Sequence, residues 1–288
     1  MGFFASINGM LAPAEEARVS VLDNGFTFGD SVYETLRTYA GRPFALARHL
    51  RRLRASAGRI GIEMTTGDDV LAGWLDALLA RAANPEAYIR MIVTRGVGDI
   101  SYHFERVKGP TVVMVTRPHE LPAASQYTEG IPVSIVSVLR NHPDALDPAI
   151  KSGNLLNNVL AVREAQAKGS VEAILLNHRG EVAEGASSNI FIVRGQEVIT
   201  PPLDAGILAG ITREIILELL PGLGIGARQK AISVSDLERA DEAFITSSLK
   251  EAAPISTLNG RPVGSGRPGP VTLRILEAFR AYAQEGRT

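Results

Sequence analysis

Hydrophobic residues recur with two different periods along the first 118 residues. Residues 46–61 and 65–85 have the three-to-four-residue spacing of helices that bury one face. Residues 87–96 and 110–118 are short apolar runs bounded by Pro or Gly, as expected for strands. The predicted buried positions of the two helices are Leu46, Leu50, Leu53, Leu71, Trp74, Leu75, Leu78 and Leu79. Mixed helices and strands predict a small N-terminal α/β domain over residues 1–118.

Local signals mark turns and helix starts. The segment "FFASING" predicts a first strand that enters a turn at Asn8-Gly9. Thr66 and Asp69 stand in capping positions for the helix in 65–85. Ser235 and Glu238 have the spacing of a capping box for a later helix.

Residues 119–130, "HELPAASQYTEG", have no hydrophobic period and predict an interdomain linker. Many short strands follow, with helices expected at about 154–168, 212–220, 235–240 and 270–284. Residues 131–288 therefore predict a larger, β-rich C-terminal domain. A two-domain α/β (α+β) architecture is the expected fold class.

Composition narrows the function. The 288 residues carry a net charge of −1 and 45% hydrophobic residues, so neither nucleic acid nor a membrane is an expected partner. The absence of cysteine excludes disulfides and thiolate metal sites, and the five histidines lack ligand-like spacing, so no metal is expected. The N-terminus has no signal-peptide pattern, and a cytoplasmic enzyme is the expectation.

Lys151 is the only charged residue in "AIKSGNLLNNVLA", residues 149–161. Only five of the 30 basic residues are lysines. Solubility does not require lysine rather than arginine, whereas an amine that acts as a nucleophile does. The simpler interpretation is a lysine at the end of a strand with its amine in solvent. The other candidate residues of the chain decide between this interpretation and a reactive amine.

Four other features complement a reactive lysine. Glu184 precedes a Gly-Ala-Ser-Ser-Asn corner, and Thr212 opens an amphipathic helix whose N-terminus favours an anion such as phosphate. Ser248 lies in a second hydroxyl-rich turn, and Arg52 lies in an arginine-rich run. An amine, a carboxylate and a phosphate cradle are what pyridoxal 5′-phosphate (PLP) requires.

Six segments together resemble the class IV aminotransferases, in order and in spacing. They are "DNGFTFGDSVYETL", "HLRRL", "IKSGNLLNNVLA", "EVAEGASSNIFIV", "GILAGITRE" and "DEAFITSSLKEAAPI". This family comprises branched-chain and D-amino-acid aminotransferases, (R)-amine transaminases and aminodeoxychorismate lyases. The resemblance covers nearly the whole chain and implies a fold type IV PLP enzyme.

The resemblance also implies roles for individual residues. Lys151 forms the Schiff base with the cofactor and moves the substrate Cα proton, and Glu184 pairs with the pyridine nitrogen. The residues that match phosphate contacts are Arg52, Ile211, Thr212 and Ser248. The residues implied for the substrate pocket are Phe28, Tyr33, Arg37, Tyr88, Arg90 and Leu249, with Phe28 a candidate for a loop that reaches a partner subunit.

The substrate signals are mixed. Tyr88 and Arg90 have the Tyr-x-Arg arrangement of branched-chain enzymes, and Arg37 matches an arginine typical of them. Thr35 instead resembles the lyases, and Leu156 replaces the tyrosine that branched-chain enzymes carry five residues beyond the lysine, as in the D-amino-acid enzymes. The Arg-x-His trap of the D-enzymes is incomplete, because no arginine precedes His103.

The sequence therefore predicts a ping-pong aminotransferase that acts on α-amino acids and 2-oxo acids, with branched-chain L-substrates favoured. D-amino-acid transamination, with (R)-amine activity, is the main alternative, and aminodeoxychorismate lyase is the third. A non-catalytic phosphate-binding protein is disfavoured because Lys151, Glu184 and Arg52 occur together. The resemblance implies a homodimer or a multiple of dimers.

Overall fold

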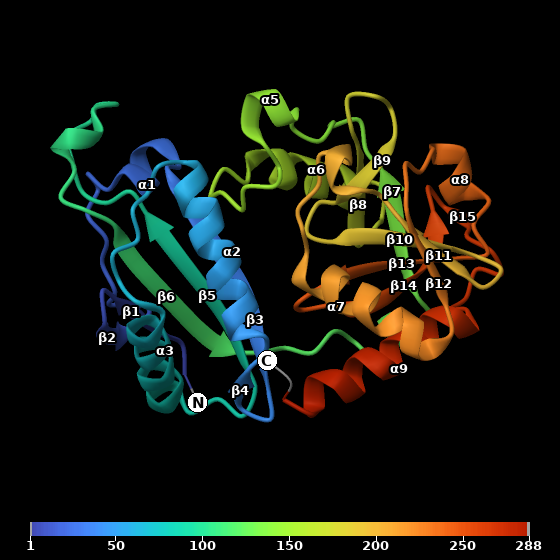
Figure 1. Cartoon of the computed structure of the whole chain (residues 1–288), viewed down its shortest axis with the longest axis horizontal. Helices are drawn as coiled ribbons and strands as arrows, with labels where there is room; N and C mark the ends of the chain where they lie inside the picture. The colour runs from blue at the N-terminus through green and yellow to red at the C-terminus, as the bar shows by residue number, and fades with distance from the viewer. Residues whose placement is uncertain (1, 287–288) are drawn as a thin grey trace. The chain divides into compact units, whose positions relative to one another are not determined.

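The computed structural model describes residues 2–286 and divides into two compact units (Figure 1). The first unit contains the described residues up to Glu120, Ile150–Asn154 and Gly286, and the second contains Leu121–Ala149 and Leu155–Glu285. The segment that carries Lys151 thus belongs to the first unit, although it follows some thirty residues of the second in the chain. Within the expected linker 119–130, a short helix, α4 (Ser125–Thr128), buries Tyr127.

The first unit is built on a six-stranded antiparallel sheet. The strands, in order across the sheet, are β2 (Met10–Pro13), β1 (Phe4–Ile7), β6 (Thr111–Pro118), β5 (Ala87–Thr94), β3 (Ser31–Tyr39) and β4 (Arg42–Pro43). Asn8 and Gly9 both have positive φ between β1 and β2, which confirms the predicted turn.

Two long helices cover one face of this sheet (Figure 1). α2 (Leu46–Arg59) and α3 (Asp68–Ala82) pack their leucines against Val32, Leu36 and Met91. Because strand side chains alternate, the neighbouring positions of β3 and β5 face the other way. The unit also contains α1 (Asn24–Phe28) and the 3₁₀ turn η1 (Phe104–Arg106).

The second unit is built on a nine-stranded mixed sheet. Its main path is β12 (Gly226–Gln229), β11 (Glu197–Thr200), β10 (Asn189–Arg194), β13 (Glu242–Ser247), β14 (Glu251–Leu258), β7 (Ile131–Ile135), β8 (Glu172–Leu176) and β9 (Val182–Gly185). The remaining strand, β15 (Arg261–Pro262), pairs with β14. The β11–β12, β14–β7 and β7–β8 pairs are parallel, and the other pairs are antiparallel.

Helices surround this second sheet (Figure 1). They are α5 (Pro143–Leu146), α6 (Leu156–Ala167), α7 (Ile211–Leu219), α8 (Val234–Glu238) and α9 (Pro270–Gln284), with 3₁₀ turns η2 (Leu203–Ala205) and η3 (Leu220–Leu223). The helices expected at about 154–168, 212–220, 235–240 and 270–284 are confirmed. The predicted mixed α/β fold class is confirmed as well, and the structure builds it on two sheets.

Both predicted helix caps are wrong. The N-cap of α3 is Gly67, which makes no side-chain hydrogen bond, in place of the expected Thr66. The capping box of α8 joins Ser233 and Asp236. Ser233 and Ser235 both have an acidic residue three positions later, and the bridge between Ile232 and Val182 keeps the chain extended until just before Ser233, which selects the first.

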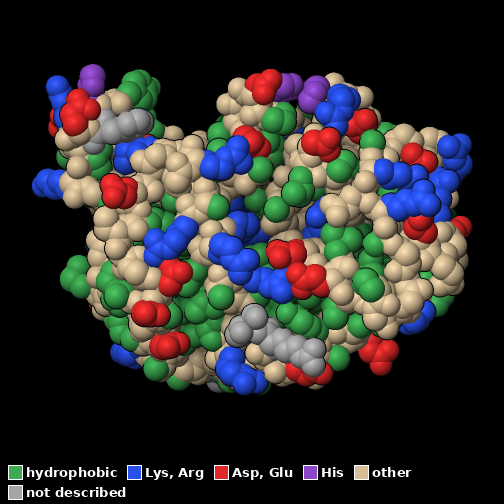
Figure 2. Space-filling view, in the orientation of Figure 1, with side chains coloured by type: hydrophobic (Ala, Val, Ile, Leu, Met, Phe, Trp, Pro, Cys, Tyr) green, Lys and Arg blue, Asp and Glu red, His purple; other side chains and the backbone are tan. Residues whose placement is uncertain are grey.

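The surface offers no single-sign field on the face drawn in Figure 2, where acidic and basic side chains are interspersed. Across residues 2–286, the helices are all too short or too polar to cross a bilayer. Over the same residues, His, Asp and Glu form no cluster of three or more that could hold a metal ion.

Candidate active site

Lys151 is held by backbone pairing with the start of β3. The Lys151 carbonyl accepts from the Tyr33 N–H at 2.9 Å, and Ser152 bridges Val32. The Lys151 N–H donates to Ser56 Oγ of α2 at 3.2 Å. The backbone on both sides of the lysine is therefore fixed, and the side chain, which is partly exposed, can present its amine.

The ring of Tyr33 meets two cations. Lys151 Nζ lies 4.5 Å from the centre of the Tyr33 ring, and the Arg90 guanidinium carbon lies 4.1 Å from it. Aromatic rings attract cations over their faces, so the Tyr33 ring stabilises both groups in place. The structure thus brings the predicted reagent and a predicted carboxylate anchor to one aromatic side chain.

Strand register collects most of the predicted pocket residues on the face of the sheet opposite α2 and α3. Thr35 pairs with Arg90, and Arg37 pairs with Tyr88 across β3 and β5. Arg37 makes other contacts on this face. Its guanidinium lies 4.2 Å from the Tyr39 ring, and its Nε donates to the Thr38 carbonyl at 3.1 Å.

Arg52 of α2 forms a bidentate ion pair with Glu34 of β3. Arg52 Nε donates to Glu34 Oε1, and Nη2 donates to Oε2, each at 2.7 Å. His49 Nδ1 also lies 2.7 Å from Glu34 Oε2. Glu34 and His49 are fully buried, so this three-residue cluster, Glu34–His49–Arg52, is a charged group inside the core.

Electrostatics determine the protonation of this cluster. Burial alone would raise the pKa of Glu34, but the Arg52 charge and the hydrogen bonds from Arg52 and His49 lower that pKa to about 2. Burial lowers the pKa of His49, against the opposite effect of Glu34. The lowered pKa values of Glu34 and His49 are both consistent with a neutral imidazole that donates from Nδ1 to an ionised Glu34.

In the second unit, Glu184 is nine-tenths buried at the end of β9, and both of its carboxylate oxygens accept hydrogen bonds. Oε1 accepts from Arg140 Nε at 2.8 Å. Oε2 accepts from Asn189 Nδ2 at 3.2 Å and from the Leu208 N–H at 3.0 Å. These donors stabilise the ionised carboxylate.

Asn189 connects Glu184 to the start of α7. Its Nδ2 also donates to the Leu208 carbonyl at 2.9 Å, which anchors the loop that leads into the helix. A Cβ on Gly210, the N-cap of α7, would stand only 1.9 Å from Asn189 Oδ1, so this position has no room for a side chain. The helix N-terminus therefore has no capping side chain, and its first N–H groups are available to a ligand.

Two buried hydroxyls near this helix have no hydrogen-bond partner within residues 2–286. They belong to Thr212, in the first turn of α7, and to Thr246, which pairs with Asn189 across β13 and β10. An unsatisfied buried hydroxyl costs free energy unless a ligand completes it. Ser248 and Leu249 follow Thr246 in a turn and are partly exposed.

These residues fit PLP. The N-terminus of α7 and the Thr212 hydroxyl could hold the phosphate, with Ile211 supplying a backbone N–H, and Glu184 could hold a protonated pyridine nitrogen. The second unit therefore contains an anion site and a buried carboxylate joined by Asn189. The first unit contains the amine.

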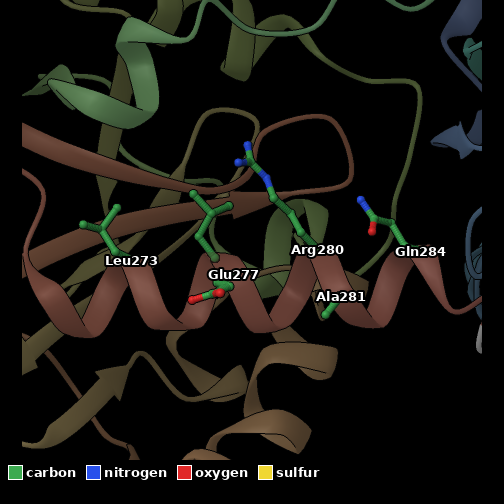
Figure 3. Close-up of a pocket in the computed structure, with 6 residues that line it drawn as sticks. Leu273, Glu277, Arg280, Ala281 and Gln284 are labelled. Atoms are coloured by element: carbon green, nitrogen blue, oxygen red, sulfur yellow. The ribbon is translucent and has the colours of Figure 1, made fainter.

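Phe28 lies at the end of α1, with its ring centre 5.0 Å from that of Tyr102. A pocket of about 410 Å³ lies along α9 (Figure 3) and contains none of the predicted site residues. It is lined by Leu273, Leu276, Glu277, Arg280, Ala281 and Gln284. This pocket is therefore separate from the candidate active site.

Sequence reasoning missed four residues that surround the predicted ones in the two units: Glu34, His49, Arg140 and Asn189. Two had a signal. Glu34 alternates with Val32 and Leu36, so a carboxylate on the buried face of a strand required a partner. His49 precedes Arg52 by three positions on the same helix face. Arg140 and Asn189 had no comparable signal.

Comparison with known proteins identifies the family of this chain. The family model for class IV amino-transferases matches residues 31–258. A putative branched-chain-amino-acid aminotransferase of Methanocaldococcus jannaschii is 37% identical over 275 residues, which is 95% of this chain and 94% of the relative. A D-alanine aminotransferase of Bacillus licheniformis is 34% identical over 273 residues, at 95% and 94% coverage.

Among solved structures, two branched-chain aminotransferases are similar along almost their whole length. That of the archaeon Thermoproteus uzoniensis, solved with norvaline, superposes with a TM-score of 0.90 at 32% identity, covering 99% of this chain and 95% of the other. That of Thermobaculum terrenum, solved in its PLP form, gives a TM-score of 0.87 at 27% identity, with 99% and 94% covered.

Proposed function

The chain belongs to the class IV aminotransferases, which are PLP-dependent transaminases, and we propose that it prefers L-amino acids of the branched-chain type. The observation that carries this preference is the Tyr33 ring, which meets both Lys151 and Arg90. An arginine beside the reacting amine can hold the α-carboxylate of a substrate whose Cα–H points to Lys151. The relative from M. jannaschii supports the same choice.

The proposed roles follow from the environments of the side chains. The bound cofactor supplies a ring that withdraws electrons from Cα when its pyridine nitrogen is protonated. The ionised Glu184 carboxylate holds that proton at the nitrogen, and the Lys151 amine moves the proton of the substrate Cα. The α7 N-terminus, Thr212 and Ser248 bind the phosphate, and Arg52, aligned by Glu34, adds positive charge to it.

The remaining pocket assignments are Tyr33, Tyr88, Arg37 and Leu249. Tyr88 lies beside Arg117 of β6, whose guanidinium carbon is 4.7 Å from its ring centre. Amino acids and 2-oxo acids are the proposed donors and acceptors. They bind in turn, so the product of the first half-reaction leaves before the acceptor enters.

A D-amino-acid transaminase is the alternative, and two observations favour it. Leu156 provides no hydroxyl where branched-chain enzymes have a tyrosine, and D-alanine aminotransferases are about as similar in sequence as the branched-chain relative. Arg90 would then hold a carboxylate that occupies the opposite pocket. The two functions share Lys151 and Glu184 and differ in the hand of the substrate.

Single half-reactions distinguish these functions. The purified PLP form is mixed separately with L-leucine, L-glutamate, D-alanine, D-glutamate and (R)-1-phenylethylamine, and the loss of its visible absorbance is followed by stopped flow. Conversion by the L-amino acids alone is the expected result. Conversion by the D-amino acids or the amine, with the L-amino acids inert, would establish the alternative.

Lys151→Ala is the control for the chemistry itself. This variant should not convert any donor, because it has no amine to bond the cofactor or move the proton. Turnover by Lys151→Ala would contradict the proposed role of Lys151, whichever hand of substrate the wild type prefers.

We propose a homodimer as the assembly. The first unit exposes Val21, Phe26 and Tyr102 by 70% or more in the single chain, and Phe28 packs against Tyr102. Adjacent apolar side chains that remain exposed, such as this aromatic pair, are typical of a protein interface. Light scattering should give a multiple of twice the 30.8 kDa chain mass, and a monomeric mass would contradict the proposal.

A further inference from the structure

One face of helix α6 holds the segment that carries Arg140. Asn157 and Glu164 are seven positions apart and therefore lie on the same side of the helix. The Glu164 carboxylate accepts from the Ser137 N–H at 2.9 and 3.0 Å and from its hydroxyl at 2.7 Å. The hydrogen bond from Lys168 and these bonds from Ser137 lower the pKa of Glu164 to about 2, so the carboxylate is ionised at neutral pH.

Asn157, in the first turn of α6, makes the second connection. Its Oδ1 accepts from Arg140 Nη1 at 3.1 Å, and its Nδ2 donates to the Leu139 carbonyl at 2.8 Å. A single amide therefore bonds both the guanidinium of residue 140 and the backbone of residue 139. Only a side chain with an acceptor and a donor at this length can make both bonds.

The Arg140 guanidinium is in turn bound at its other side. Arg140 Nε donates to Glu184 Oε1. The backbone N–H of Arg140 donates to the Leu176 carbonyl at 2.8 Å, which fixes the start of the side chain. Arg140 and Glu184 side chains are only 10% and 6% exposed, so water cannot easily replace a lost partner. The guanidinium thus connects Asn157 to Glu184.

We propose that Asn157 is a positioning residue for Glu184, acting through Arg140. With Asn157 in place, the guanidinium meets Oε1 through a single nitrogen, and Oε2 keeps its bonds to Asn189 and Leu208. Without Asn157 the guanidinium is free to turn and to pair with both carboxylate oxygens, as Arg52 does with Glu34. The carboxylate then offers less negative charge to a bound pyridine nitrogen.

This inference rests on the proposed role of Glu184 as partner of that nitrogen. The test compares wild type with Asn157→Ala, Arg140→Lys and the double variant. Gln166→Ala is the matched control, because Gln166 is an exposed amide at the far end of the same helix. Apoprotein is titrated with PLP to obtain the dissociation constant, and the visible absorbance of the PLP form is titrated with pH.

Asn157→Ala should raise the PLP dissociation constant about fivefold, as expected for the loss of one ordinary hydrogen bond from the group that holds Glu184. It should also shift the pH midpoint of the visible absorbance by roughly half a unit, because the charge near the ring changes. In the Arg140→Lys background, Asn157→Ala should change neither the PLP dissociation constant nor the pH midpoint further. Lysine has no planar guanidinium whose orientation Asn157 could determine. Gln166→Ala should match wild type.

Two results would overturn the inference. One is an Asn157→Ala protein with wild-type affinity and pH midpoint. The other is a lower thermal midpoint of the Asn157→Ala apoprotein with no change in the pH midpoint, which is a purely structural effect. Glu184→Gln distinguishes a failure of the Asn157 inference from a failure of the proposed role of Glu184. If Glu184→Gln leaves PLP affinity and absorbance unchanged, the proposed role of Glu184 is wrong.

Discussion

Arg52 and Glu34 form two parallel hydrogen bonds of 2.7 Å from a helix to a buried strand position. The pair joins α2 to β3 on the covered face of the sheet, and His49 adds a third bond to the same carboxylate. Arg52, the predicted phosphate ligand, is therefore oriented by the protein before any ligand binds. Pre-orientation of this kind reduces the entropy lost on binding.

Glu34→Gln should lower the free energy of unfolding of the apoprotein by about 3 kcal/mol, because it removes the buried carboxylate that balances the Arg52 charge. Urea denaturation followed by circular dichroism measures this change. Glu63→Gln, at an exposed acidic position, is the control and should change little. A Glu34→Gln protein as stable as this control would show that the ion pair contributes nothing to folding.

Acidification should destabilise the wild type through His49. Because burial lowers the pKa of His49 below 6.5, the unfolded chain takes up the proton first. Stability is therefore fully present above about pH 6.5 and falls below it, by about 1.4 kcal/mol per pH unit for this one group. Unfolding curves between pH 7 and 5 should show this slope reduced in His49→Asn and retained in His103→Asn, at an exposed histidine.

Glu34 extends the loss of stability to lower pH. Its folded pKa of about 2 lies below the ordinary value of 4.5, so its contribution is present above pH 4.5 and is lost as the pH falls toward 2. Wild type should therefore lose stability in this interval more steeply than Glu34→Gln. Parallel curves for the two proteins below pH 4.5 would contradict an ionised Glu34 in the fold.

Thr212→Val should weaken PLP binding about tenfold without destabilising the apoprotein. Valine has nearly the same shape and removes a buried hydroxyl that has no partner in the described chain, whereas a bound phosphate loses a donor. Fluorescence titration with PLP and thermal denaturation of the apoprotein measure the two effects. Thr272→Val, which removes a similar buried hydroxyl from α9, should leave PLP affinity unchanged, and an equal loss in both variants would refute a phosphate role for Thr212.

Arg90→Gln should raise the KM for the preferred amino acid by roughly ten- to a hundredfold, because a charged contact to the carboxylate is lost. PLP affinity should stay near wild type. Steady-state kinetics with the best donor test this, and Arg81→Gln is the control, because Arg81 packs on the Phe4 ring from α3. An unchanged KM in Arg90→Gln would exclude Arg90 as the carboxylate anchor.

Local sequence patterns predicted most of the fold. The 3.6-residue period located α2, α3 and α7, because a helix must bury one face whatever it packs against. Helix caps were predicted less well. Ser235 and Glu238 have the spacing of a capping box, yet Ser233 is the N-cap of α8. The bridge from Ile232 to Val182, fifty residues earlier in the chain, determines this start.

By itself, the sequence determined the chemical inventory: a rare lysine, a turn carboxylate and a hydroxyl at a helix start, in the order of one enzyme family. Tertiary structure decided the partners. Lys151 meets Tyr33 from more than a hundred positions away, and Glu34 meets Arg52 only because α2 lies on β3. A period of two or 3.6 residues shows which face is buried, whereas the partner of a buried charge depends on packing between distant elements.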